Sequence, residues 1–136
     1  ISGGMAKRVG IARALVMEPE LLIYDEPTSG LDPVTSRTVD DLIEEMREKF
    51  GVTSAVITHD MVSAFDIADQ IAMLIKGRVV AQGSPAAVLA SPHEDVQRFI
   101  RASGVSAARL ATRRPRRPSA ELAQLAKARQ AGVAQG

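Results

Sequence analysis

Short apolar runs alternate with amphipathic stretches along the first hundred residues, and this alternation constrains the fold more than any other feature. Residues 4–17 carry apolar side chains at helical spacing, and Leu21 to Tyr24 form an unbroken apolar run. Such a run is typical of a strand covered on both faces. Pro33 then opens a second helical stretch that Asp32 can cap. Strands alternating with helices predict an α/β fold, a mainly parallel sheet flanked by helices.

The alternation continues to about residue 104. Residues 53–58 and 71–75 read as further strands, with a short helix expected between them. The turn Lys76-Gly77-Arg78 predicts a β-hairpin whose second strand adds an antiparallel edge to the sheet. Two short helices should follow, each begun by a Ser-Pro pair, at Ser84 and at Ser91.

The net charge of +1 conceals two segments of opposite sign, because residues 1–104 have a balance of −5 and residues 105–136 a balance of +6. In the second segment prolines interrupt the arginines and no apolar stripe continues, although residues 120–131 are rich in alanine. We therefore expect a domain over residues 1–104 and a basic tail over 105–136, disordered or weakly helical. The tail can be a solvated extension, contact anionic lipid, or bind nucleic-acid phosphates. No aromatic residue lies among the arginines, so no specific nucleic acid is expected.

Composition excludes several classes of protein. The chain has no cysteine, which rules out disulfides and thiolate metal sites in these 136 residues. Its longest apolar runs have five residues, far fewer than the roughly 20 that a membrane-spanning helix needs.

Two adjacent carboxylates end the first predicted strand. Asp25 stands where open α/β sheets bind their ligands, and a carboxylate there can hold Mg²⁺. Glu26 should face away from Asp25 by strand alternation, and it can polarise an attacking water as general base. The plain alternative is a polar strand end beside a Pro-Thr-Ser-Gly turn.

Two further polar motifs can serve the same edge. His59 follows the second predicted strand, so a parallel sheet would bring it near Asp25 and Glu26, unless it is simply a solvent-facing loop residue. Ser2-Gly3-Gly4 opens the first helix, where bare backbone N–H groups favour an anion. An ordinary serine cap followed by flexible glycines is the alternative for that motif.

Taken in order, ISGGM, LLIYDEP, SGLD and ITHD resemble the second half of an ATP-binding-cassette (ABC) ATPase over about residues 1–103. The resemblance assigns Ile1–Met5 to the signature motif, residues 21–25 to Walker B, Glu26 to the catalytic glutamate, residues 29–32 to the D-loop and His59 to the switch histidine. The hairpin around Gly77 also resembles the one that follows the switch histidine in this family.

The resemblance implies an ATPase of P-loop NTPase-like fold that uses ATP and Mg²⁺ and works as a head-to-tail dimer with a second nucleotide-binding subunit. Ser2, Gly3 and Gly4 would contact the γ-phosphate of ATP held by the partner. Asp25, as the metal ligand, together with Glu26 and His59, would act on ATP in the same subunit. Asp32 would couple the two sites. An integral-membrane permease is then the expected partner and the cytoplasmic face of the inner membrane the expected location. The alternative is an ABC-type ATPase without a membrane partner, acting in DNA repair, chromosome maintenance or translation.

The chain departs from the family pattern in two ways. It contains no G-x-x-x-x-G-K-[ST] motif and no Q-loop region, so we expect a C-terminal half that alone has negligible affinity for ATP. Met5 replaces the usual glutamine of the signature, and SGGMAKRVG resembles the Mla-type phospholipid-transport ATPases. That likeness implies a phospholipid or related hydrophobic substrate and an MCE-domain lipid-binding protein as a further partner.

Overall fold

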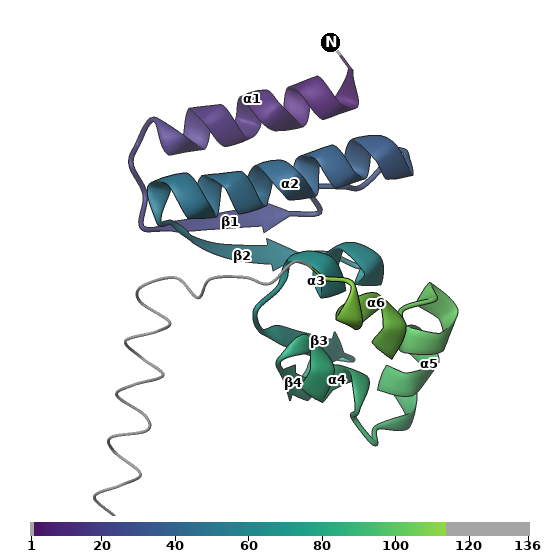
Figure 1. Ribbon diagram of the computed structural model, residues 1–136. Helices are drawn as coiled ribbons and strands as arrows, with labels where there is room; N and C mark the ends of the chain where they lie inside the picture. Colours follow the sequence, from purple (N-terminus) through teal and green to yellow (C-terminus); the bar gives the residue numbers. More distant parts are fainter. Residues whose placement is uncertain (1, 114–136) are drawn as a thin grey trace, which may run out of the picture.

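In the computed structural model, which describes residues 2–113, helices and strands alternate as predicted and the α/β class is confirmed (Figure 1). The elements are α1 (Gly3–Leu15), β1 (Leu21–Asp25), α2 (Pro33–Phe50), β2 (Thr53–Ile57), α3 (Met61–Ile67), β3 (Ile71–Ile75), β4 (Arg78–Gly83), α4 (Pro85–Leu89), α5 (Glu94–Ser103) and α6 (Ala107–Ala111). The expected weak helix at 120–131 and the arginines from Arg114 onward lie outside the described residues.

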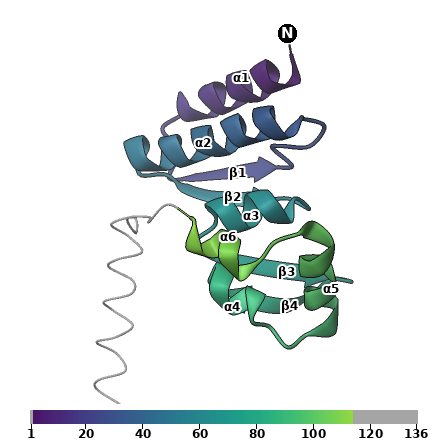
Figure 2. The same cartoon turned by 45° about the vertical axis from the view of Figure 1, so that its right-hand side comes forward.

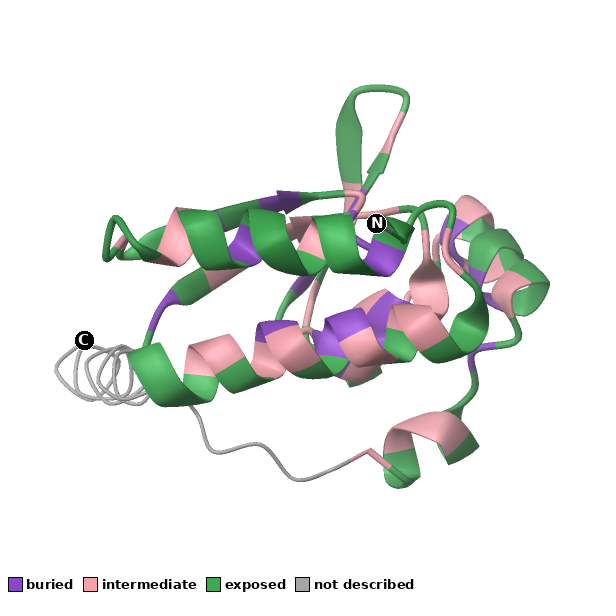
Figure 3. Ribbon diagram, turned by 90° about the horizontal axis from the view of Figure 1, so that it is seen from above, coloured by how far each residue is buried: buried purple, intermediate pink, exposed green. Residues whose placement is uncertain are grey.

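The parallel part of the fold is the pair β1 and β2, which run in register from Leu21 opposite Thr53 to Asp25 opposite Ile57. Helices α1 and α2 lie side by side over one face of this pair (Figures 1 and 2). Their shared core takes its buried residues from α1, β1, α2, the residue before β2 and the end of α3: Ile11, Leu22, Tyr24, Val39, Ile43, Val52 and Ile67. Seen from above, the outer side of α1 is mostly exposed while buried residues lie on the side of α1 and α2 toward that core (Figure 3).

The other face of the parallel pair is open, contrary to the expectation of cover on both faces. Leu21, Ile23 and Ile57 are all more than half exposed. Burial alternates along β1, so only Leu22 and Tyr24 reach the core. Within residues 2–113 no element packs over this face, although its apolar side chains suit a buried one.

The hairpin forms a separate sheet and is not an edge of the parallel one, which corrects the predicted topology. Strands β3 and β4 pair with each other, with an irregularity in register between Met73 and Leu74. The hairpin has a core of its own, shared with α3, α4, α5 and the segment after α5: Phe65, Ile71, Met73, Val88, Val96, Ile100 and Val105. Burial of the hairpin in this second core, away from β1 and β2, explains the separation.

Packed structure also continues past the predicted boundary at residue 104. Val105 is buried, and α6 follows it. From α6, Arg109 donates to the Asp66 carboxylate through Nε at 3.0 Å and through Nη2 at 2.6 Å. Arg113 donates to the Asp66 carbonyl oxygen at 2.9 Å. Two of the arginines assigned to a basic tail are therefore bound to α3.

The start of α5 also differs from the prediction, because the helix begins at Glu94 and not at the Ser91-Pro92 pair. The Gln97 side-chain amide donates to the carbonyl oxygens of Leu89 and Ser91, at 3.0 and 2.8 Å. These bonds fix residues 89–93 as a turn between α4 and α5. No helix within residues 2–113 is both long and apolar enough to cross a lipid bilayer.

Candidate functional site

The carboxyl ends of β1 and β2 lie at one edge of the parallel pair, and the N-termini of α1 and α2 lie toward the same end of the molecule (Figure 1). Asp25 is the last residue of β1 and is exposed, while His59 follows β2 by two residues. The parallel register thus brings together groups that are more than thirty residues apart in sequence. This is the edge at which open α/β sheets bind ligands.

Glu26 does not continue the strand, so strand alternation does not set the direction of its side chain. Its backbone has φ of 48°, in the left-handed region. Its N–H donates to the Ile57 carbonyl oxygen at 2.8 Å, which ties the turn after β1 to the end of β2. Glycine usually occupies such a conformation, so a glutamate there indicates that several contacts hold it.

The Glu26 carboxylate meets His59 through both of its oxygens. Oε1 accepts a hydrogen bond from the His59 backbone N–H at 3.2 Å, and Oε2 lies 2.9 Å from His59 Nδ1. The hydrogen bond and the charge of Glu26 raise the pKa of His59 above its ordinary value of 6.5. The Glu26 side chain is 35% exposed and the His59 side chain 81% exposed, so solvent reaches this pair although Glu26 Oε2 itself is buried.

The loop that carries His59 is fixed by its neighbours. Asp60 caps α3 by accepting from Ser63 N–H at 3.1 Å, and its own N–H donates to Thr58 Oγ1 at 2.9 Å. Buried Thr28, in the turn after β1, donates to Asp60 Oδ2 at 3.4 Å. The turns that follow β1 and β2 are therefore connected by two contacts, Glu26 with His59 and Thr28 with Asp60.

At the start of α1, Ser2 is an N-cap whose Oγ accepts from Met5 N–H at 3.2 Å. Gly3 and Gly4 also have a packing role, which the sequence did not predict. A Cβ on Gly4 would lie 2.6 Å from Thr35 Cγ2, and one on Gly3 would lie 3.2 Å from Leu31 Cδ2. Gly4 thus permits the close approach of α1 to α2, while the first amides of α1 remain at an exposed helix end suited to an anion.

Asp32 is the N-cap of α2, as its position before Pro33 predicted. Its Oδ1 accepts from the N–H groups of Val34 and Thr35 at 3.0 Å each, and its Oδ2 accepts from Thr35 Oγ1 at 2.5 Å. The hydrogen bonds from Thr35 hold the pKa of Asp32 below its ordinary value. Asp32 therefore caps α2 with both of its carboxylate oxygens and is not part of the Glu26–His59 pair.

Asp25 is the residue that suits a metal ion. Among residues 2–113 no group of three or more potential ligands gathers at one place. Mg²⁺ needs no such cage, because it is usually held by one or two carboxylates together with water and substrate phosphates. The exposed Asp25 carboxylate fits that requirement, while the Glu26 carboxylate is engaged by His59.

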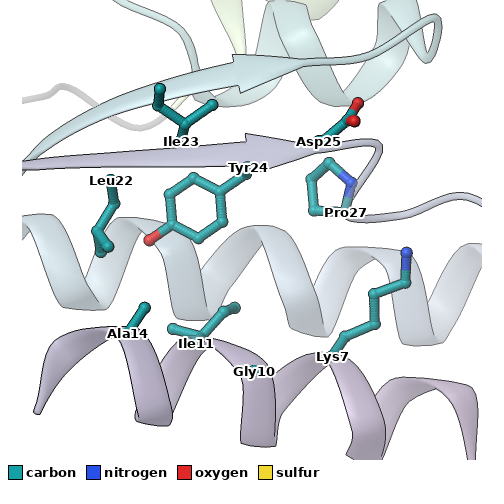
Figure 4. Close-up of a pocket in the computed structure, with 9 residues that line it drawn as sticks. All are labelled: Lys7, Gly10, Ile11, Ala14, Leu22, Ile23, Tyr24, Asp25 and Pro27. Carbon is teal, nitrogen blue, oxygen red and sulfur yellow. The ribbon is translucent and has the colours of Figure 1, made fainter.

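A mostly apolar pocket of about 260 Å³ lies between α1 and β1 and ends at Asp25 and Pro27 (Figure 4). Lys7 projects from α1 toward that end, and its ammonium group donates to the Glu26 carbonyl oxygen at 2.8 Å. Burial raises the pKa of Tyr24, which also lines the pocket.

Sequence reasoning did not identify Lys7, Thr28 or Asp60 as parts of the site. The position of Asp60 directly before a helix signals a cap. No local pattern signals the contacts of Lys7 and Thr28, because each joins residues from different elements.

Comparisons with known proteins agree with this arrangement. Residues 1–29 match the sequence family described as ABC transporter. The methionine import ATP-binding protein MetN of Burkholderia thailandensis is 46% identical over 100 residues, which cover 74% of this chain and 29% of that protein. The MetN protein of Rhizobium etli is 44% identical over 100 residues, covering 74% of this chain and 28% of that protein.

Solved structures show the same likeness. CbiO1 from Clostridium perfringens, part of the ABC transporter complex cbiONQ, is 40% identical with a TM-score of 0.63, covering 75% of this chain and 40% of that one. The ADP conformation of MJ1267, an ATP-binding cassette of an ABC transporter, is 28% identical with a TM-score of 0.64, covering 73% and 39%. The chain spans under a third of the length of the curated relatives, and its matched part has the fold of their kind of ATPase domain.

Proposed function

We propose that this chain is the C-terminal part of the nucleotide-binding domain of an ABC transporter ATPase, which couples ATP hydrolysis to transport. The observation that carries the proposal is the contact of the Glu26 carboxylate with His59 beside Asp25, at the carboxyl edge of the parallel strands. The sequence and fold likeness to ABC ATP-binding proteins supports it. Residues 1–104 would belong to this domain, and the packing of Val105 and α6 extends it to at least Arg113.

In this proposal each residue of the edge has one task. Asp25 would hold Mg²⁺, which would supply positive charge to the ATP phosphates. Glu26 accepts a hydrogen bond from the attacking water and polarises it as general base. His59 keeps the Glu26 carboxylate in place from one side and presents its imidazole edge toward the terminal phosphate.

The residues at the helix N-termini would serve a dimer. Ser2 and the amides of Gly3 and Gly4 would contact the γ-phosphate of ATP bound by a second nucleotide-binding subunit, since a helix N-terminus favours an anion and Ser2 and Gly3 are exposed there. Asp32, at the start of α2, would lie near that contact and couple the two sites. A permease in the membrane would receive the motion of the dimer, with the ATPase at the cytoplasmic face.

Substitution of Glu26 by Gln in the full-length ATPase tests the catalytic assignment. We expect the variant to bind ATP but to hydrolyse it at least about a hundredfold more slowly, because an amide cannot act as the base. Glu45→Gln, on the exposed part of α2 where Glu45 pairs with Lys49, is the matched control and should leave turnover unchanged. Turnover of Glu26→Gln close to the wild-type rate would refute the role of Glu26.

Two substrate classes have an observation in their favour. The MetN relatives are named as ATP-binding proteins of methionine import, which favours methionine or a similar small solute. Met5 in the signature resembles the Mla-type ATPases, which favours phospholipid and an MCE-domain partner. Copurification of the permease, followed by stimulation of ATP hydrolysis by methionine or by phospholipid in nanodiscs, distinguishes them. Copurification with DNA or ribosomes instead would support an ATPase without a membrane partner.

A further inference from the structure

Lys7 reaches from α1 to the turn that contains Glu26. Its ammonium group donates to the Glu26 carbonyl oxygen at 2.8 Å in a part-buried position beside Pro27 (Figure 4). A hydrogen bond from a charged donor is about twice as strong as a neutral one. Lys7 lies on the same helix as Gly4, three residues further along.

The backbone of Glu26 needs such contacts because its φ of 48° is in the left-handed region. For a non-glycine residue this conformation is strained, and it persists only where the surroundings enforce it. β2 holds the Glu26 N–H at 2.8 Å, and Ser29 N–H donates to the Glu26 carbonyl oxygen at 3.2 Å. Lys7 supplies the second and shorter bond to that oxygen.

We propose that Lys7 is a positioning residue that fixes the backbone of Glu26 and so aims its carboxylate at the attacking water. The proposal rests on the function proposed above. It also gives α1 a direct connection to the hydrolytic centre: a shift of α1 moves the ammonium group that holds Glu26. The N-terminus of α1 and the Glu26–His59 pair are thus joined inside one chain through a single side chain.

Steady-state kinetics of the full-length ATPase test this role with three variants. Lys7→Met removes the donor and keeps most of the stem, and we expect kcat to fall at least about tenfold, because small misplacements of a catalytic group are costly. The KM for ATP should stay within about twofold. Lys7→Arg, whose guanidinium group can still donate, should keep kcat within about threefold of wild type. Lys49→Met, at a remote lysine that pairs with Glu45, is the control and should match wild type.

A double variant separates positioning from a general effect on the fold. If Lys7 acts through Glu26, then adding Lys7→Met to Glu26→Gln lowers the residual rate by less than about twofold. Thermal unfolding of each variant checks that it is folded. If Lys7→Met does not fold, Lys7→Gln, which retains a polar group but is too short to reach, replaces it.

Two results would overturn the proposal: an unchanged kcat in Lys7→Met, whether or not KM rises, or a full additional loss in the double variant. A raised KM would assign Lys7 to nucleotide binding. A wild-type rate in Lys7→Met together with an inactive Glu26→Gln would refute the role of Lys7 and leave the proposed function standing. Equal rates in wild type and Glu26→Gln would refute both.

Discussion

At the scale of single residues, the contact between Glu26 and His59 makes a prediction about pH. Glu26 raises the pKa of His59, so the protonated imidazole and the contact are present at low pH and are lost as pH rises through that raised value. We expect Glu26→Gln to move the His59 midpoint back toward its ordinary value. An NMR titration of the imidazole protons measures this, with His93 as the internal reference. An unchanged His59 midpoint would show that the contact is absent in solution.

Gly4 provides a second prediction at this scale. An added Cβ would meet Thr35 Cγ2 at 2.6 Å, and Thr35 is held by its hydrogen bond to Asp32. We expect Gly4→Ala to lower the free energy of unfolding by about 1–3 kcal/mol through overpacking. Urea denaturation measures the loss. Adding Thr35→Ser, which removes the methyl group and keeps the hydroxyl, should restore most of it.

Gly10→Ala is the matched control for Gly4, because nothing lies within 4 Å of a Cβ at Gly10 on the same helix. This change should be neutral or stabilising by up to about 1 kcal/mol, the usual difference between glycine and alanine in a helix. Equal effects at Gly4 and Gly10 would contradict the packing role of Gly4.

At the scale of elements, α2 and α3 are joined by a buried carboxyl group. Ser63 Oγ donates to Asp40 Oδ1 at 2.7 Å, and burial raises the pKa of Asp40 from 3.8 to about 6. An acid with a raised pKa binds protons more readily in the folded state, so its contribution to stability is lost as pH rises from 3.8 through about 6.

Asp40→Asn removes this pH dependence, since an asparagine carbonyl can still accept from Ser63 and carries no charge to bury. At pH values above the raised pKa, we expect the free energy of unfolding of the variant to exceed that of wild type by about 2 kcal/mol. This difference should disappear near the ordinary pKa of an aspartate. Urea denaturation at about pH 8 and pH 4 measures both values. A variant less stable than wild type at the higher pH would contradict the prediction.

The attachment of α6 is the second prediction about elements. Arg109 binds the Asp66 carboxylate through two nitrogens, at 3.0 and 2.6 Å. We expect Arg109→Met to release α6, seen as faster amide hydrogen exchange over residues 107–113 with little change in the core strands. Arg98→Met, which breaks an exposed pair with Asp95 within α5, is the control. Unchanged exchange in α6 would show that the other contacts of this segment, from Val105 and Arg113, hold it without Arg109.

The spacing of apolar residues predicted most helices and strands, because this spacing depends on residues that are close together in the sequence. The sequence also predicted that His59 would share one edge of the sheet with Asp25 and Glu26, since parallel strands bring their carboxyl ends together. It missed what depends on distant contacts: the left-handed backbone of Glu26, the fit of Gly4 against Thr35, and the burial of Val105. The charge change near residue 104 predicts a domain end there, although Arg109 and Arg113 bind Asp66.

At the scale of the whole molecule, α3 connects the two cores. Phe65 lies in the core of the hairpin, and Ile67, two residues on, lies in the core of the parallel pair. Asp60 caps this helix directly after His59. The position of His59 relative to Glu26 therefore depends on both cores, and destabilising either one should disturb the candidate site.

The open face of β1 and β2 supports the last prediction. Ile23 is 65% exposed and Ile57 56% exposed on the uncovered side of strands whose other side is packed. The 136 residues contain no Walker A motif to hold the ATP phosphates. We expect this chain alone to bind an apolar dye through that face, and we expect Ile23→Glu to reduce the amount of dye bound. We also expect the chain alone to hydrolyse ATP no faster than its Glu26→Gln variant. The full-length ATPase should hydrolyse ATP and bind little dye. If the 136-residue chain hydrolyses ATP and Glu26→Gln abolishes that activity, the prediction is wrong. These residues would then bind the nucleotide as well as cleave it.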